Sequence, residues 1–386
     1  MKHKRKKIIQ TSITLAAVIL FFLFIWLYGG SVQRTPLQSQ DGMSFEQGEV
    51  VKIINGEKGG EENTVSGMAG NQDVQVRITS GSHRGEVVDA SNINGYLYGA
   101  NCRVGTKVIL QLSEYDDTVS ASVYGYDRGI QIYVLIGIFL VLLCIIGGRR
   151  GIYSALALVF TFICLIGMYL PMLYQGCNPF LATILTVCVI TVVSLLLISG
   201  YTKKTLCAIL GTIAGVAVSG CIAMLFGKLA HISGYNTEDI ESMVYVAQNS
   251  KLQIGDLLYA GILIAALGAV MDVAMSVAST IQEIYEKNPG LTRRELFYSG
   301  IHVGRDMMGT MSNTLILAFA GTSLNTMILI YAYSFPYQQI INMYSIGIEI
   351  MRGVSGTIGI ILTVPFVSFL ASMMIHKHSR KWRIRK

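Results

Sequence analysis

One apolar segment of the chain carries a line of small and polar residues that includes an acidic side chain. The segment runs from Ala265 to Ser276 as AALGAVMDVAMS. Gly268, Asp272, Ser276 and Thr280 follow one another at four-residue intervals, which places them on one face of a helix. Small residues on such a face let a second helix approach closely, so the Asp272 carboxylate is expected at a helix contact.

The next apolar segment opens with a second polar stripe. It consists of His302, Asp306, Thr310 and Asn313, with Arg305 and Gly309 beside it. At a rise of ~1.5 Å per residue, Asp272 is expected about one to two turns from the cytoplasmic end, near the depth of Thr310 and Asn313. We therefore expect Asp272 to meet Thr310 or Asn313 between two antiparallel helices, with Arg305 nearer the cytoplasmic mouth.

Asp272 is the residue of these stripes with a clear chemical role. An ionisable side chain within a membrane span costs free energy, so its presence there suggests a functional role. The functional interpretation is that Asp272 binds a proton or a cation near neutral pH and that its occupancy changes how the two helices pack. The alternative is a permanently hydrogen-bonded or arginine-paired Asp272 that fixes the helix register. Asp306 and His302 are less informative, because they are expected near the membrane surface.

The composition indicates a membrane protein. Of the 386 residues, 52% are hydrophobic and 14% are charged, whereas soluble domains carry roughly a quarter charged residues. We expect an α-helical polytopic membrane protein with about eight transmembrane helices. The expected spans are Ile8–Tyr28, Ile130–Gly147, Ile152–Tyr174, Phe180–Ser199, Thr205–Gly227, Ile254–Val277, Asp306–Leu329 and Val354–His376. The stretch Ile330–Arg352 stays open between an interfacial helix, a re-entrant piece and a ninth span.

The positive charges indicate the orientation. Eleven of the 30 Lys and Arg residues lie at the two ends of the chain. The remaining 19 are fewer than the 23 acidic residues. The net charge of +7 therefore indicates topology and no nucleic-acid partner. The internal basic clusters, all expected on the cytoplasmic side, are Arg149-Arg150, Lys203-Lys204, and Lys287 with Arg293-Arg294. We expect a multi-pass protein of a bacterial plasma membrane, with both termini in the cytoplasm.

The chain divides into four expected parts. Residues 1–28 are a basic N-terminus and an uncleaved signal anchor, since no A-x-A-like site follows the first apolar run. Residues 29–129 are a small, mostly-β extracytoplasmic domain, residues 130–376 a seven-helix membrane domain, and residues 377–386 a basic tail. Within the polar domain, period-two runs separated by turn residues predict a barrel or sandwich of about five strands. The Gly56–Asn71 stretch is expected to be a hairpin tip or linker.

The loop Ile281–Gly300 contains a helix-start signal. Thr292 and Glu295 have the T-x-x-E spacing of a capping box, which predicts a short amphipathic helix on the membrane surface. Such a helix could dock a cytoplasmic partner or couple the two spans, and a well-capped connector is the simpler interpretation.

Enzyme motifs do not occur in the sequence. It has no His-Glu-x-x-His, no Walker A lysine loop and no membrane serine paired with an intramembrane histidine. The seven cysteines have no Cys-x-x-Cys spacing, so neither a disulfide framework nor a zinc site is expected. Cys102 and Cys177 are the two that could form a bridge outside the membrane. We expect no catalytic residues, no metal and no cofactor.

The motifs around the two polar stripes resemble the YibE/F family of bacterial membrane proteins. They are Gly268-Ala-x-Met271-Asp272, the Asn-Pro-Gly loop, and Gly304-Arg305-Asp306-Met-Met-Gly309-Thr310-Met-Ser-Asn313-Thr314. The resemblance covers most of the chain from about Ile130 onward. The anchor and extracytoplasmic domain resemble the longer, YibE-type members, which implies a shorter YibF-like membrane partner, with a homo-oligomer as the alternative.

A second resemblance concerns mechanism. An intramembrane Asp272, a connector bearing Glu283, and a helix with Thr310 and Asn313 are similar to the proton-relay region of the RND superfamily, including SecD and SecF. This resemblance implies Asp272 as a relay carboxylate, with Asn313 and Arg305 as partners.

Together these features predict a plasma-membrane permease or permease subunit for an unknown small substrate, driven by proton-motive force. The β domain would be an extracellular gate or docking module. The competing interpretation is a non-transporting scaffold or assembly factor that acts with a partner membrane protein.

Overall fold

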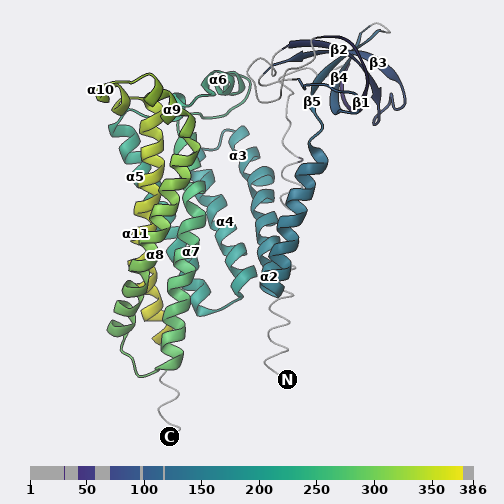
Figure 1. Ribbon diagram of the computed structural model, residues 1–386. Helices are drawn as coiled ribbons and strands as arrows, with labels where there is room; N and C mark the ends of the chain where they lie inside the picture. Colours follow the sequence, from purple (N-terminus) through teal and green to yellow (C-terminus); the bar gives the residue numbers. More distant parts are fainter. Residues whose placement is uncertain (1–29, 31–41, 57–69, 96–98, 116–117, 377–386) are drawn as a thin grey trace. The chain divides into compact units, whose positions relative to one another are not determined.

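The computed structural model describes residues 30, 42–56, 70–95, 99–115 and 118–376 (Figure 1). The expected span Ile8–Tyr28 and the basic tail 377–386 lie outside these residues. The described chain divides into two compact units, and the boundary lies at Leu143. We call residues 42–142 the barrel unit and residues 143–376 the helical unit, and describe each by itself.

The barrel unit contains a closed five-stranded barrel, which confirms the expected small β domain. Its strands are β1 (Met43–Gly56), β2 (Gly70–Ile78), β3 (Val87–Asn94), β4 (Lys107–Tyr115) and β5 (Thr118–Tyr126). They pair in the order β1-β2-β3-β5-β4, and β1 closes the barrel by pairing with β4. The β3–β5 pair is parallel and the other pairs are antiparallel. Alternate side chains such as Val74, Val76 and Ile78 point inward and are buried.

A buried polar network fixes one side of the barrel. The Asn92 side-chain amide donates hydrogen bonds to Gln72 Oε1 (3.0 Å) and to the Ala100 carbonyl oxygen (2.6 Å). In return, the Ala100 backbone N–H donates to Asn92 Oδ1 (3.2 Å), and the Cys102 N–H donates to Gln72 Oε1 (3.0 Å). The network therefore satisfies polar groups of β2, β3 and the segment that follows β3.

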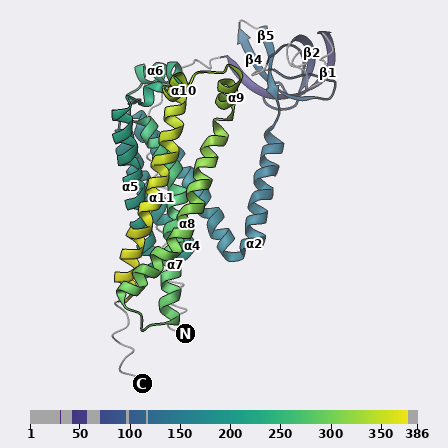
Figure 2. The ribbon, with the colours of Figure 1, turned by 60° about the vertical axis from the view of Figure 1, so that its left-hand side comes forward.

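The helical unit is built from long apolar helices (Figures 1 and 2). They are α2 (Gly129–Cys164, whose first part belongs to the barrel unit), α4 (Pro179–Ser199), α5 (Lys203–Leu229), α7 (Leu257–Lys287), α8 (Arg293–Thr322) and α11 (Tyr344–His376). Shorter helices are α3 (Leu170–Tyr174), α6 (Ile240–Gln248), α9 (Leu324–Ala332) and α10 (Tyr337–Ile341), and a π-helical segment, Leu165–Tyr169, joins α2 to α3. In both views α6, α9 and α10 lie at the end of the helical unit away from the α7–α8 turn.

Among the described residues, five helices are long and apolar enough to cross a membrane, or six if the bent α8–α9 pair counts as one span. This supports a polytopic membrane protein and leaves the expected number of eight spans unconfirmed. The first of the five, Gly129–Tyr174, is interrupted at Gly148, whose φ of 53° and ψ of −133° are not helical. A Cβ on Gly151 would overlap the carbonyl oxygen of Leu143, although eight residues of straight helix separate two atoms by ~12 Å. The chain therefore turns back sharply at Gly148 (Figure 2).

Several predicted boundaries were wrong. The short surface helix expected at Thr292 is the first turn of the long helix α8, although its capping box is present: Glu295 N–H donates to Thr292 Oγ1 and Thr292 N–H donates to Glu295 Oε2. Helix α7 continues to Lys287, so the α7–α8 connection is a five-residue turn, residues 288–292. The ambiguous stretch Ile330–Arg352 comprises the end of α9, the short α10 and the first turns of α11.

The core of the helical unit surrounds α7, which contacts α4, α5, α8 and α11. Val270, Val273, Ala274 and Val277 of α7 are fully buried. Helices α5 and α11 approach each other closely through small residues, since a Cβ on Gly215 would overlap the Thr363 hydroxyl of α11. Close packing through glycine is typical of helix pairs in membranes, where van der Waals contacts drive association.

Candidate functional site

Asp272 lies at the midpoint of α7. The helix extends from Leu257 to Lys287, so 15 residues precede Asp272 and 15 follow it. At ~1.5 Å per residue, the carboxylate is ~22 Å from either end of the helix. It is thus about four turns from the end of the helix, because the helix continues ten residues beyond the predicted end of the span at Val277.

The face of α7 that bears Asp272 is open. Gly261, Ala265, Gly268 and Asp272 are exposed, whereas the opposite face is fully buried. A Cβ on Gly268 would meet no atom within 4 Å. We expected a second helix to pack on the Gly268–Asp272–Ser276 stripe, but within the described part of the chain no helix covers it at Gly268. Ser276 is half-buried, and its carbonyl oxygen accepts a hydrogen bond from Thr280 Oγ1 (2.9 Å).

The polar stripe of α8 is exposed as well. Its exposed members are His302, Arg305, Asp306, Gly309, Thr310 and Asn313. The Thr310 hydroxyl donates within its own helix, to the carbonyl oxygens of Met307 (3.0 Å) and Asp306 (3.3 Å). Gly304 is the glycine of this motif that packs against another helix, since a Cβ there would overlap Val364 of α11. Gly309, predicted as a packing residue, has no atom within 4 Å of its Cβ position.

The depths of the two stripes can be compared from the turn that joins α7 and α8. Counted from that turn, Asp272 is the sixteenth residue of α7, and Arg305, Thr310 and Asn313 are residues 13, 18 and 21 of α8. Arg305 and Thr310 thus lie within ~5 Å of the depth of Asp272, and Asn313 is ~7 Å deeper. Arg305 is therefore nearer the turn than Asp272, Thr310 and Asn313, in the expected order, and Asp306, residue 14 of α8, lies at almost the same level as Arg305.

The structure does not join the predicted residues by direct bonds. In the described residues, neither a hydrogen bond nor an ion pair links the Asp272 carboxylate to Arg305, Thr310 or Asn313, and that carboxylate has no other polar partner there. The arrangement therefore does not support a permanently paired Asp272. It presents two acidic side chains, Asp272 and Asp306, and one basic side chain, Arg305, near the middle of exposed faces of two neighbouring helices.

The sequence reasoning missed an ion pair in α11. Arg352 Nη1 donates to Glu349 Oε1 at 2.8 Å, and the side chains are 33% and 21% exposed. The second carboxylate oxygen of Glu349 is buried without a partner among the described residues. The i, i+3 spacing of opposite charges was a usable signal, but the stretch before Val354 was not recognised as part of the last long helix.

No metal ligands can be assigned: the described residues contain no group of three His, Cys, Asp or Glu side chains that could hold a metal ion. Cys102, which is buried in the barrel, and Cys177 are both free thiols in the structure.

Comparison with known proteins agrees with the motifs of α7 and α8. No curated protein and no solved structure matches the chain. The resemblance to the RND superfamily therefore finds no support. A family model described as YibE/F-like protein matches residues 135–377, which include both polar stripes. Because this match covers more than half of the sequence, the chain belongs to the YibE/F family.

Proposed function

We propose that this protein is a transporter, or a transporter subunit, of a bacterial plasma membrane, and that Asp272 couples it to protons. The observation that carries the proposal is the Asp272 carboxylate, at the midpoint of a spanning helix, on an open face and without a polar partner among the described residues. A carboxylate at that depth cannot face lipid without a large cost. It is therefore expected to line a hydrated path or to bind a cation.

The proposed topology has eight spans with both termini in the cytoplasm. Support comes from the reversal at Gly148, which divides the 46-residue stretch Gly129–Tyr174 into two apolar arms. With α4, α5, α7, α8 and α11 this gives seven spans, and Ile8–Tyr28 would be the eighth. The α4–α5 and α7–α8 turns lie at one end of the helical unit (Figure 1). The basic residues Lys203 and Arg293 begin the helices after these turns, and Arg149 follows the reversal at Gly148, so the positive-inside rule assigns these turns to the cytoplasm.

Proton binding would act on the packing of α7 and α8. Protonation removes the charge of Asp272 and lowers the cost of exposing it to an apolar environment. Deprotonation restores a negative charge close to the depth of Arg305, which favours an approach of the two side chains. Gly268 and Gly309 leave space on the two helices for such an approach. Thr310 and Asn313 would supply polar groups along the same path.

The proposal is tested by proton flux into proteoliposomes after an imposed pH gradient. Wild-type protein is compared with Asp272→Asn, and with Glu286→Gln as a control that removes a carboxylate from an exposed end of the same helix. We expect flux that is lost in Asp272→Asn and kept in Glu286→Gln. Equal flux in all three proteins, at equal insertion and folding, would refute the proton relay.

The alternative is a non-transporting scaffold or assembly factor that covers the same face with a partner membrane protein. In that case Asp272→Asn would change the recovery of the partner or the abundance of the protein, and flux would not depend on Asp272. Measuring abundance beside flux therefore separates the two functions.

A further inference from the structure

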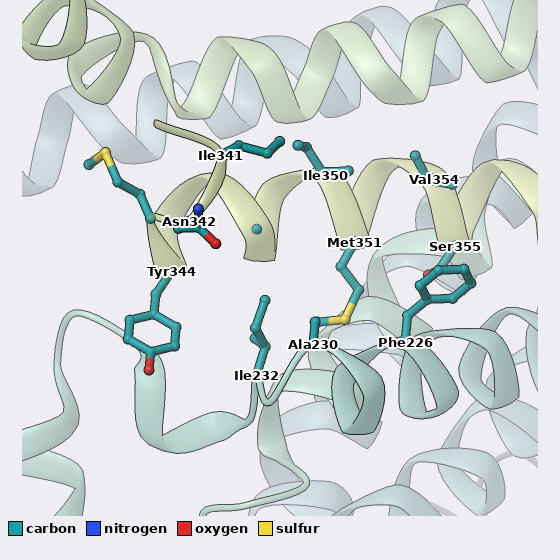
Figure 3. A pocket seen from close by; sticks show the side chains of 12 residues that line it. Phe226, Ala230, Ile232, Ile341, Asn342, Tyr344, Ile350, Met351, Val354 and Ser355 are labelled. Carbon is teal, nitrogen blue, oxygen red and sulfur yellow. The ribbon is translucent and has the colours of Figure 1, made fainter. Parts of the chain in front are cut away.

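A cavity of about 370 Å³ lies between α5 and α11, away from the polar stripes. Its walls come from the end of α5, from the segment after α10 and from the first turns of α11 (Figure 3). The volume is within the range of small-molecule sites. Phe226, Ile350, Met351 and Val354 make most of the lining apolar, so the cavity offers few partners for water.

The polar groups of the cavity are not evenly distributed. Figure 3 shows Asn342 and Tyr344 at one end, Ile232 and Met351 in the middle, and Phe226 and Val354 at the other end. Asn342 follows the last residue of α10, and Tyr344 begins α11. The two large polar side chains of the lining thus lie at one end, and the small hydroxyl group of Ser355 is the polar group at the other end.

The position of Asn342 and Tyr344 at one end matches the expected position of α11 in the bilayer. Helix α11 has 33 residues and is ~50 Å long, whereas the hydrocarbon core is ~30 Å thick. Its first ~10 Å would then lie at the level of the lipid headgroups, with Asn342 and Tyr344. Val354 is ten residues after Tyr344, ~15 Å further along, and reaches the level of the acyl chains.

The cavity wall faces outward from the helical unit. Ile350 and Val354 are 50% and 46% exposed, and Phe226 on α5 is 53% exposed. Both α5 and α11 are long and apolar enough to span a membrane, so this surface is expected to face lipid. We propose that the cavity binds one acyl chain of a membrane phospholipid, with the headgroup beside Asn342 and Tyr344. This site is independent of the proposed proton coupling.

The test uses the full-length protein in vesicles of phosphatidylethanolamine and phosphatidylglycerol. The vesicles are doped with a phosphatidylethanolamine that carries a photoactivatable diazirine in one acyl chain, and adducts are mapped by peptide mass spectrometry. We expect adducts concentrated on the peptides that contain Phe226 and Met351. Val354→Trp, which fills the cavity, should reduce them at least five-fold.

Ile361→Trp is the matched control, because Ile361 is an exposed residue two turns further along α11 and does not line the cavity. It should keep the adducts. Ile350→Trp is a second cavity-filling variant in case Val354→Trp does not fold. Adducts spread evenly over all lipid-facing helices, or equally strong in the filled variants, would overturn the proposal. The proposal would also be overturned if a diazirine fatty acid labelled the cavity and the phospholipid probe did not.

Discussion

Lys203 donates a hydrogen bond of 2.7 Å from its ammonium group to the carbonyl oxygen of Met374. Lys203 is the first residue of α5 and Met374 lies in the last turn of α11, where carbonyl groups have no partner within their own helix. A cation at this position also interacts favourably with the negative end of the α11 dipole. The bond holds the α4–α5 turn and the end of α11 together at one end of the helical unit.

This shared end gives a prediction about orientation. In a background without the seven native cysteines, Gly290→Cys in the α7–α8 turn should be inaccessible to a membrane-impermeant maleimide in spheroplasts and should react after permeabilisation. Asn249→Cys, at the end of α6, should react without permeabilisation. Both positions are exposed, so burial within the protein does not explain a difference in their reaction with the maleimide. The reverse pattern would place the basic turns outside and contradict the proposed topology.

The second prediction compares two glycines of one motif. Gly304→Ala should destabilise the helical unit by about 1–3 kcal/mol, because the new methyl group would overlap the Val364 side chain. Gly309→Ala should not destabilise it, since its Cβ position is open and alanine forms helix more readily than glycine. The thermal stability of both variants is measured in detergent by heating the protein and following the loss of the folded peak in size-exclusion chromatography. Equal melting temperatures for the two variants would show that the α8–α11 contact is looser than described.

Hydropathy predicted the centres of the long helices but not their ends. Gln282, Glu283 and Glu286 end the apolar run of α7, yet the helix continues through them to Lys287. A Glu283–Lys287 ion pair and a Gln282–Glu286 hydrogen bond at i, i+4 favour the helix there. A hydropathy pattern reports contact with lipid, whereas helices extend beyond the bilayer. The same reason explains why the start of α11 at Tyr344, with its Glu349–Arg352 pair, was missed.

The candidate site was predicted in part. The four-residue spacing placed Gly268 and Asp272 on one face of a helix, and both are on the same exposed face of α7. The spacing did not predict which face of α8 is covered by the neighbouring helices. Gly304 and Gly309 belong to one motif, but only Gly304 meets Val364, and this depends on the position of α11, 60 residues later in the chain.

The third prediction concerns the buried network of the barrel. Asn92→Ala should destabilise the barrel by about 2–4 kcal/mol, because it leaves the Ala100 backbone groups and Gln72 without partners in a buried site. Asn71→Ala, an exposed substitution on β2, is the control and should change little. The rate of limited proteolysis within residues 42–126 of the full-length protein measures the effect. Equal rates for the two variants would mean that the network contributes little to stability.

The last prediction is a pH dependence of barrel stability. Burial raises the pKa of the Cys102 thiol from 9.0 to about 11. The folded barrel thus holds this proton to higher pH than the unfolded chain does. The contribution of the thiol is complete below pH 9 and is lost as the pH rises from 9 to 11, for a total of about 3 kcal/mol.

Urea unfolding of the barrel in the full-length protein, followed by labelling of Cys102 in a variant that keeps no other cysteine, measures this dependence. At pH 8 the folded thiol should not react with iodoacetamide, and the labelling midpoint should move to lower urea between pH 9 and pH 11. The same shift in a Cys102→Ala variant, followed by proteolysis, would assign the pH dependence to other groups. A shift found only when Cys102 is present would identify its buried thiol as the titrating group, since the substitution removes no other ionisable side chain.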